Sequence, residues 1–338
     1  MSLELHIYGS GYGETILLRW PTATGWNGAV VDARCLRKGE WLAGKIRELE
    51  IDNLELVSAT HPHADHIYNL AAGVEASGKP VGKCTFWGGG SLSLWRAFFI
   101  RLEKENKEVE NQRFAQMAHE FIKWLLRKHA TPVRDLVGDP DDSIHTFFET
   151  VAGTTALKFR SLGPWFDGMA QIARDLTAVK DGKPLAFKLT DANAVSTAML
   201  IEYGDAQIVL GADMEEANWA EVAKSTGYPQ FRPSVVKVSH HGSANGRIQG
   251  MWPQGGGFFH GRGKDAIAVV TPWQLAGNEL PKGTAIIEEI CAAGFDLYLT
   301  AQGSGRNAES HVAIRVEADG SADVISIAKD VRHFPRHP

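Results

Sequence analysis

Three imidazole side chains and one carboxylate lie within six residues of this sequence, at His61, His63, Asp65 and His66. Neutral imidazole and carboxylate are ligands that zinc, manganese and iron accept in proteins. His61 and His63 are two positions apart, so their side chains point the same way in an extended segment. The alternative is a polar loop that happens to be rich in histidine, but by chance such a cluster should arise in roughly one chain in a thousand. The cluster therefore predicts a metal site.

Regular elements must hold these ligands in place. The apolar run at 54–59 comes directly before the cluster and predicts a strand that ends there. Two further apolar strands are expected to end in ligand-type residues, Asp213 after one, and His240 with His241 after the other. Loops that follow strands gather at one edge of a sheet, so these residues can meet. Taken alone, Asp213 could equally cap a helix that starts at Met214.

The rest of the chain alternates strands, turns and helices, which predicts an α/β fold. The glycine cluster at 9–13 lacks the spacing of a phosphate-binding loop and predicts a tight hairpin. Strands are also expected at 156–162 and 198–202. Residues 266–300 predict a strand–helix–strand unit, and residues 311–327 a closing hairpin.

One segment differs in character from its surroundings. Between 95 and 125, aromatic and aliphatic residues recur at helical spacing with charges between them, which predicts two helices joined near 104–110. The aromatic stripe is interpreted as core packing, with a docking surface for a protein partner as the alternative. We expect a single domain at 1–328, a helical insertion within it at 90–180, and a poorly anchored tail at 329–338.

The composition limits the function classes. Hydrophobic residues make up 44% and charged residues 22% of the 338 residues, which is ordinary for a globular protein. A net charge of −5 gives no general attraction for nucleic acid, so such a substrate would need a local basic patch or the metal itself. Cys35, Cys84 and Cys291 are few and far apart, which argues for a reducing compartment. With no secretion signal and no apolar run long enough to span a membrane, the sequence predicts a cytoplasmic protein.

These motifs resemble the metallo-β-lactamase superfamily, and within it the ComEC-like branch named after the DNA-uptake competence protein. The resemblance rests on the strings at 60–66, 210–213 and 237–243, and more weakly on Asn278 and Pro281 in the last part of the chain. It covers both ends of the chain and leaves out mainly the middle. It implies a four-layer αββα sandwich into which the helical segment is inserted.

The resemblance also implies one or two divalent ions, zinc or manganese. The first two histidines of the cluster would bind one ion, the next Asp–His pair a second, and the Asp after the later strand would bridge them. The implied ligands are His61, His63, Asp65, His66, Asp213, His241 and Asn193.

One of these ligands departs from the family pattern. The superfamily usually has another histidine before the strand that leads to the bridging Asp213, whereas Asn193 stands at that place here. An amide oxygen is a weaker ligand than imidazole for a transition metal. The first ion would then be held loosely, or Asp191 would help to hold it.

Other residues are expected to act beside the ligands. By the same resemblance, Asp32 would orient the loop at 61–66 and Ser243 would support the later ligands without binding the ion. Asp65 would also orient the attacking water, and His240 would contact the substrate, so these two are the expected catalytic residues.

Two ions that share a carboxylate and a water lower the pKa of that water enough to give hydroxide near neutral pH. The sequence therefore predicts a metal-dependent hydrolase. By analogy with the ComEC-like branch, the leading hypothesis is a phosphodiesterase or nuclease, with Lys237, Ser243, Asn245 and Arg247 able to hold a phosphate. The substrate would be a phosphodiester or another small molecule, with nucleic acid included.

Two alternatives stay open. An apolar pocket lined by Trp252, Trp273 and the aromatic insertion would favour hydrolysis of a lactone or thioester. Because the expected third histidine is missing, the chain could instead be a catalytically weak metal-binding module in a larger assembly, with the insertion as its docking surface.

Overall fold

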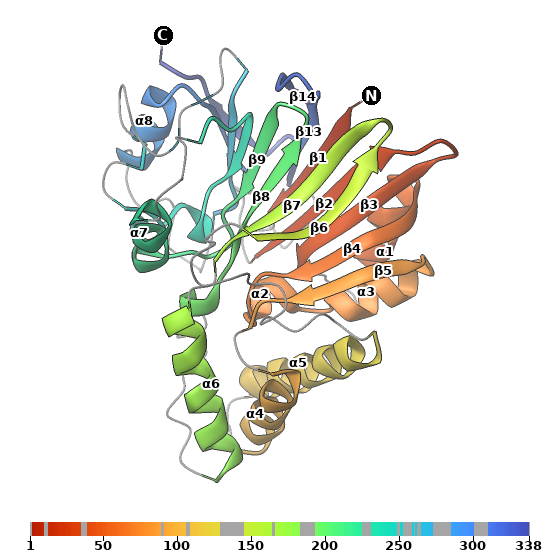
Figure 1. Cartoon of the computed structure of the whole chain (residues 1–338), viewed down its shortest axis with the longest axis vertical. Helices are drawn as coiled ribbons and strands as arrows, with labels where there is room; N and C mark the ends of the chain where they lie inside the picture. The colour runs from red at the N-terminus through yellow and green to blue at the C-terminus, as the bar shows by residue number, and fades with distance from the viewer. Residues whose placement is uncertain are drawn as a thin grey trace.

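The computed structural model describes residues 2–9, 13–34, 39–88, 91–105, 109–128, 145–163, 166–182, 193–224, 231–248, 251–252, 259, 261, 265–272, 285–300 and 310–337. Two large sheets with helices around them make up this part of the chain, which confirms the expected α/β class (Figure 1).

The first sheet has seven strands in the order β14-β13-β1-β2-β3-β4-β5. The outer four strands on the β14 side are antiparallel, and β3, β4 and β5 run parallel to one another. The pairing of β1 with β2 confirms the predicted hairpin around residues 9–13, of which 10–12 lie outside the described residues. The strands are β1 (Leu3–Gly9), β2 (Glu14–Pro21), β3 (Trp26–Ala33), β4 (Ile51–Ala59), β5 (Val81–Phe86), β13 (His311–Val316) and β14 (Ala322–Ile327).

The second sheet has eight strands in the order β15-β12-β11-β10-β9-β8-β7-β6. Strands β9 to β12 are parallel, while both edges of the sheet are antiparallel. The strands are β6 (His145–Ala152), β7 (Thr155–Leu162), β8 (Ala198–Tyr203), β9 (Ala206–Leu210), β10 (Val235–Lys237), β11 (Ile267–Val270), β12 (Asp296–Leu299) and β15 (Arg332–Phe334).

The two sheets pack face to face. Successive side chains of a strand point to opposite faces, and one buried cluster joins the inner faces, with Leu5 and Ile16 of the first sheet against Met199, Ile208 and Val269 of the second. Helices cover the outer faces. On the first sheet these are α1 (Glu40–Glu48) and α3 (Leu70–Ser77), and on the second α7 (Glu216–Lys224) and α8 (Ala285–Ala292) (Figure 1). The layers are therefore helix, sheet, sheet and helix.

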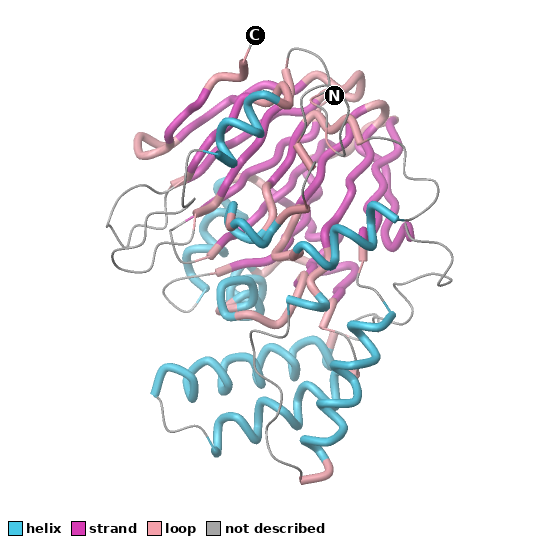
Figure 2. The backbone as a smooth tube through the Cα atoms, turned by 90° about the vertical axis from the view of Figure 1, so that its left-hand side faces the viewer, coloured by secondary structure: helices cyan, strands magenta, loops and turns pink. Residues whose placement is uncertain are grey.

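Three longer helices lie together at one end of the molecule, away from both chain termini (Figures 1 and 2). They are α4 (Leu92–Glu105), α5 (Val109–Arg127) and α6 (Phe166–Lys180). The aromatic stripe lies in their core, where the ring of Phe99 lies 5.6 Å from Trp95 and 5.8 Å from Phe114. Phe121 is buried in the same cluster as Ile67 of the segment that carries the predicted metal ligands. The stripe packs internally and supports that segment.

Two expectations about the chain's organisation need correction. The segment 90–180 is helical only in part, because residues 145–162 form β6 and β7 at the edge of the second sheet. The strand at 156–162 was expected, whereas β6 was not. The described part of the tail, 329–337, is anchored, since Phe334 pairs with Leu297 of β12 and the backbone N–H of Arg336 donates to Asp296. A three-residue strand paired on one side leaves too short a pattern for sequence analysis to detect.

No helix in the described part of the chain is long and apolar enough to cross a membrane.

Candidate metal centre

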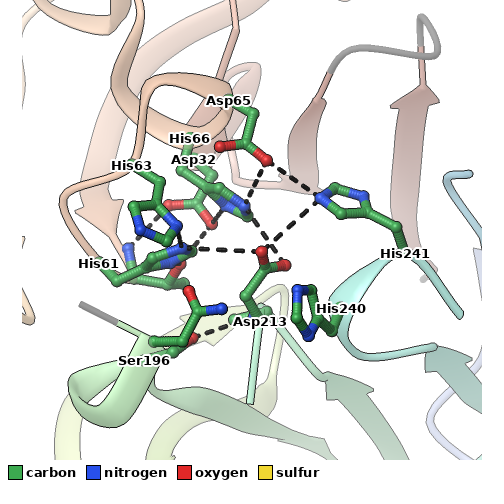
Figure 3. Close-up of polar contacts among 12 residues, drawn as sticks. Asp32, His61, His63, Asp65, His66, Ser196, Asp213, His240 and His241 are labelled. Carbon is green, nitrogen blue, oxygen red and sulfur yellow. Dashed lines mark hydrogen bonds and ion pairs between the residues drawn. The ribbon is translucent and has the colours of Figure 1, made fainter. Parts of the chain in front are cut away.

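The predicted ligands come from strand ends in both sheets and meet between the sheets. The first sheet supplies the loop after β4 and the short helix α2 (Ala64–Ile67). The second supplies the loop after β9 and the 3-10 helix η4 (His240–Gly242) after β10. The ligands brought together in this way are His61, His63, Asp65, His66, Asp213 and His241 (Figure 3).

One group of donor atoms joins Asp65, His66, Asp213 and His241, and these atoms all lie within 4.8 Å of one another. His66 Nε2 lies 3.4 Å from Asp65 Oδ2 and 3.4 Å from Asp213 Oδ1. His241 Nε2 lies 3.0 Å from Asp65 Oδ2 and 3.6 Å from Asp213 Oδ2. All four side chains are buried.

A second group joins His61, His63 and Asp213, whose donor atoms also lie within 4.8 Å of one another. His61 Nε2 lies 3.8 Å from Asp213 Oδ2 and 2.9 Å from His63 Nδ1. Asp213 belongs to both groups, so its carboxylate lies between the two sets of histidines, as a bridging ligand must.

The spacing of these atoms fits a metal ion. Two atoms that each lie about 2.1 Å from a tetrahedral zinc ion are about 3.4 Å apart. The cross-element distances of 3.4–3.8 Å around Asp213 are close to that value and too long for good hydrogen bonds. His66 Nε2 and Asp213 Oδ1 are buried, face each other and form no hydrogen bond. Buried polar atoms left in this way call for a partner such as an ion.

The carboxylate of Asp32 fixes which nitrogen of two of these histidines carries hydrogen. Its oxygens accept from the backbone N–H and the hydroxyl of Thr60 at 2.7 and 2.6 Å, and from His66 Nδ1 at 2.7 Å. Because the Thr60 hydroxyl hydrogen is used in this way, its oxygen accepts from His61 Nδ1 at 3.1 Å. Both rings therefore present the lone pair of Nε2 to the centre, as metal-binding histidines do.

The ring of His241 is oriented by the same logic from the second sheet. Its Nδ1 lies 2.8 Å from the carbonyl oxygen of Thr271, which can only accept, so Nδ1 carries the hydrogen. The lone pair of Nε2 then faces the oxygens of Asp65 and Asp213. Lone pairs that face each other in this way repel unless a proton or a cation lies between them.

The pKa shifts show how strongly the site attracts positive charge. Burial alone would lower the pKa of His66, but the carboxylates of Asp65, Asp213 and Asp32 outweigh it and raise that pKa well above its usual value. Burial, followed by the neighbouring His66 ring, lowers the pKa of His61 well below its usual value. One ring is therefore held neutral, while the other lies in a field that favours a proton or a metal ion.

The buried charges do not balance among the side chains. With the histidines counted as neutral, as metal ligands are, the buried charged side chains at this centre are four carboxylates and one ammonium group, which leaves an excess of three negative charges. Buried charge is costly unless it is paired or coordinates a metal. The charged residues are Glu14, Asp32, Asp65, Asp213 and Lys237. The donor set, its spacing and its charge thus fit a divalent cation.

The backbone is strained at the same place. Asp32, Ala212, His240 and His241 have φ angles of 56°, 47°, 45° and 55°, the left-handed region that side chains with a Cβ atom avoid. Asp32 is the extra residue of a β-bulge, since Thr15 pairs with Ala33 and the next pair is Ile16 with Val31. A bulge turns a side chain away from its regular face. Such strain clusters at functional sites.

Gly13 packs directly against a ligand. It has φ 131°, and a Cβ atom there would lie 2.6 Å from both Cβ and the carbonyl oxygen of Asp65. Only glycine adopts this φ without strain. The hairpin between β1 and β2 therefore supports the helix that carries Asp65.

The two residues of the second histidine pair differ in their position. His241 contributes a donor atom to the ligand group, whereas His240 does not. His240 has Nδ1 3.7 Å from Oε1 of Glu215, and its side chain is 21% exposed, so it lies at the edge of the centre (Figure 3). Ser243 donates to Asn245 at 2.7 Å and supports this loop rather than a ligand directly.

The side chain of Asn193 has an amide oxygen that accepts no hydrogen bond within the described part of the chain. Its amide nitrogen donates to Glu215 at 2.9 Å, while its buried Oδ1 has no hydrogen-bond partner. Its backbone carbonyl accepts from the N–H of Ser196, whose hydroxyl in turn accepts from the N–H of Asp213 at 3.0 Å. The amide oxygen is thus held ready to accept or coordinate. Asp191 lies outside the described residues.

The two basic side chains that were predicted to hold phosphate form ion pairs with other residues. Lys237 is fully buried and paired with Glu14, and Arg247 is paired with Glu289 of α8. Trp252, a residue whose presence in the pocket would favour a lactone or thioester substrate, packs instead against Phe295 in the outer core of the second sheet. Trp273, Asn278 and Pro281 lie outside the described residues.

Sequence reasoning missed Glu14, Glu215 and Thr271 as parts of this centre. Glu215 could have been noticed as a second carboxylate two residues after Asp213. Glu14 and Thr271 had no signal, because a single polar residue at a strand end is common and its neighbours depend on how the sheets pack.

Comparison of the chain with protein-family models gives no match, and comparison with curated proteins gives none either.

Proposed function

We propose that this protein is a metal-dependent hydrolase with the αββα metallo-β-lactamase fold, which uses one or two zinc or manganese ions to hydrolyse a phosphodiester bond. The observation that carries the proposal is the pair of His/Asp donor groups that share Asp213. The helix–sheet–sheet–helix layers and the position of the centre at the strand ends support it, as do the motifs of the ComEC-like branch.

The chain's own residues take distinct parts in this reaction. The donors of the two groups, with the amide oxygen of Asn193, would hold the metal. Bound divalent cations supply two things: a lowered pKa of a coordinated water, and neutralisation of charge on the departing oxygen. Asp65 Oδ2 contacts the rings of His66 and His241, and its other oxygen points away from His241 (Figure 3). In the proposal that oxygen accepts a hydrogen bond from the attacking water, and His240 contacts the substrate.

With two ions bound, charge favours an anionic substrate. Two divalent cations would bring four positive charges to a cluster that has an excess of three negative ones, whereas a single ion would leave an excess of one negative charge. Because Lys237 and Arg247 are engaged in ion pairs, the phosphate would be bound by the metal and by neutral groups rather than by basic side chains. A cytoplasmic location belongs to the same proposal, on the basis of the free, buried Cys84 and Cys291.

The first experiment is metal analysis of the purified protein. It is followed by turnover of a chromogenic phosphodiester, a phosphomonoester and a lactone with added manganese or zinc. We expect turnover of the diester only with metal, and we expect Asp65→Ala to abolish it while the protein stays folded. Asp52→Ala removes an exposed carboxylate far from the centre and serves as the matched control. Unchanged turnover in Asp65→Ala would exclude the proposed mechanism, and turnover of the lactone alone would move the substrate class to acyl compounds.

A further inference from the structure

A buried ion pair connects the two sheets directly behind the metal ligands. On β10, Val235 faces the inner core and Val236 the outer one, so the alternation of a strand turns Lys237 inward. On β2, Ile16 faces the inner core, and Glu14 two residues earlier also faces inward. Each of these positions would ordinarily carry an apolar residue. Instead Lys237 is 0% and Glu14 1% exposed, and the two side chains pair across the gap between the sheets.

A third polar residue completes this bridge. Thr271 follows β11, on which Ile267 and Val269 face the inner core, so it too points inward. Its hydroxyl donates to Glu14 Oε2 at 2.8 Å. We use the term inter-sheet brace for the three residues Glu14, Lys237 and Thr271.

The brace contacts the segments that hold three of the ligands. Lys237 Nζ donates to the carbonyl oxygen of Ala212 at 3.3 Å, the residue directly before Asp213, and that oxygen also accepts from the N–H of His240 at 2.8 Å. The carbonyl of Thr271 accepts from His241 Nδ1. From the first sheet, His66 Nδ1 lies 3.9 Å from Glu14 Oε1.

Stability alone does not account for such a pair. Desolvation of two charges offsets much of their attraction, and replacing a buried ion pair by apolar residues of similar size is often neutral for stability. Residues that orient metal ligands, by contrast, typically change metal affinity 10- to 100-fold when they are replaced. The brace is placed to orient metal ligands, because it contacts the segments that carry them in both sheets.

We propose that Glu14 and Lys237 are positioning residues that set the distance between the ligands of the first sheet and those of the second, and thereby the affinity for the divalent cation. This inference rests on the metal site of the proposed function. Without the pair, Asp213 and His241 would stay at the ends of their strands, but their distance from His66 would no longer be fixed.

The test uses the double variant Glu14→Gln/Lys237→Met, which removes both charges with little change of volume and leaves neither one unpaired. We expect a dissociation constant for zinc that is 10- to 100-fold higher. We also expect an altered visible absorption spectrum of the cobalt-substituted protein, because that spectrum reports ligand geometry. The denaturant midpoint of the metal-free protein should stay close to that of the wild type.

A matched control is Glu4→Gln/Arg19→Met. This pair links β1 and β2 within one sheet, with a distance of 2.8 Å and little exposure, and contacts none of the metal ligands. It should leave the zinc affinity and the cobalt spectrum unchanged. If the control variant loses as much zinc affinity as the brace variant, the effect is one of general destabilisation. That result would overturn the inference.

The outcomes separate this inference from the proposed function. If the wild-type protein binds no divalent cation, the proposed function fails and the inference with it. If the wild type binds and the brace variant has the same affinity and spectrum, only the inference fails. Should the double variant not fold, Thr271→Val removes the hydroxyl bond to Glu14 and keeps the backbone bond to His241. It should weaken zinc binding several-fold, and unchanged binding there overturns the inference as well.

Discussion

Replacing Asp32 by Asn should weaken metal binding without disturbing the backbone. The side chain lies in a left-handed bulge, a conformation that Asn tolerates as well as Asp does. The substitution keeps one acceptor and turns the other into a donor. In the wild type, Thr60 Oγ1 and His66 Nδ1 both donate to the same oxygen of Asp32. If the new amide nitrogen takes the place of that oxygen, it donates to these two atoms, which must then accept. The hydrogen of His66 then moves to Nε2, and the Thr60 hydroxyl can donate to His61, which moves that ring's hydrogen in the same way.

The magnitude follows from the number of rings affected. Replacing a residue that orients one ligand typically lowers metal affinity 10- to 100-fold. Asp32 sets the hydrogen position of both His61 and His66, so the loss should lie near the upper end, about 100-fold or about 2.7 kcal/mol. If the amide turns the other way, its nitrogen faces the N–H of Thr60. Two donors then repel each other, and this repulsion displaces the same loop that carries His61 and His66.

The assay is competition for zinc against a chromophoric chelator, with circular dichroism to check the fold. Asp52→Asn is the control, because that carboxylate also accepts from a backbone N–H, at 3.0 Å from Trp26, but is exposed and away from the centre. A zinc dissociation constant for Asp32→Asn within threefold of the wild type, with Asp52→Asn also unchanged, would refute the reasoning about hydrogen positions.

Three further predictions follow from the same contacts. His240→Ala should keep the metal content and raise KM, because His240 contributes no donor atom; equal loss of metal in the His240 and His241 variants would contradict this. Gly13→Ala should lower both thermal stability and metal content, because its Cβ atom would lie 2.6 Å from Asp65; a metal content equal to the wild type would show that the hairpin yields freely. Contact with His6, followed by Arg19, lowers the pKa of Glu4 to about 2. The pKa of Glu4 is lower in the folded protein than in the unfolded one, so ionised Glu4 stabilises the fold above about pH 4.5, and this contribution is lost as the pH falls toward 2. It should amount to about 2 kcal/mol after allowance for screening. Denaturant unfolding between pH 6 and 3 should therefore show a smaller drop in stability for Glu4→Gln than for the wild type, and parallel curves would count against it.

That these candidate ligands form a cluster could be predicted from sequence because the pattern is local. His61, His63, Asp65 and His66 are close in the chain, and the strand before them shows clearly as an apolar run. Asp213 and His241 were found because each follows a strand of the same kind. In these cases the ligand and the element that carries it lie in one short segment.

The supporting groups could not be predicted in the same way. Lys237 looked like a phosphate contact, since a basic residue beside a histidine pair is usually at the surface. Its burial depends on the alternation of β10 and on the position of β2 in the other sheet, which no local pattern shows. The role of Glu14 could not be predicted for the same reason, because its partner Lys237 is distant in sequence and lies in the other sheet. The edge strand β6 and the short strand β15 were missed because each has only one neighbour, and their exposed residues blur the pattern.

The ligands of the first donor group are separated by up to 176 positions along the chain, from Asp65 to His241. During synthesis the nascent chain would therefore expose its histidine-rich loop long before the second sheet has left the ribosome. If the centre binds a metal as proposed, the cation is held firmly only after both sheets have docked. Metal capture would then mark the end of folding, and any early encounter with the loop alone would be weak and reversible.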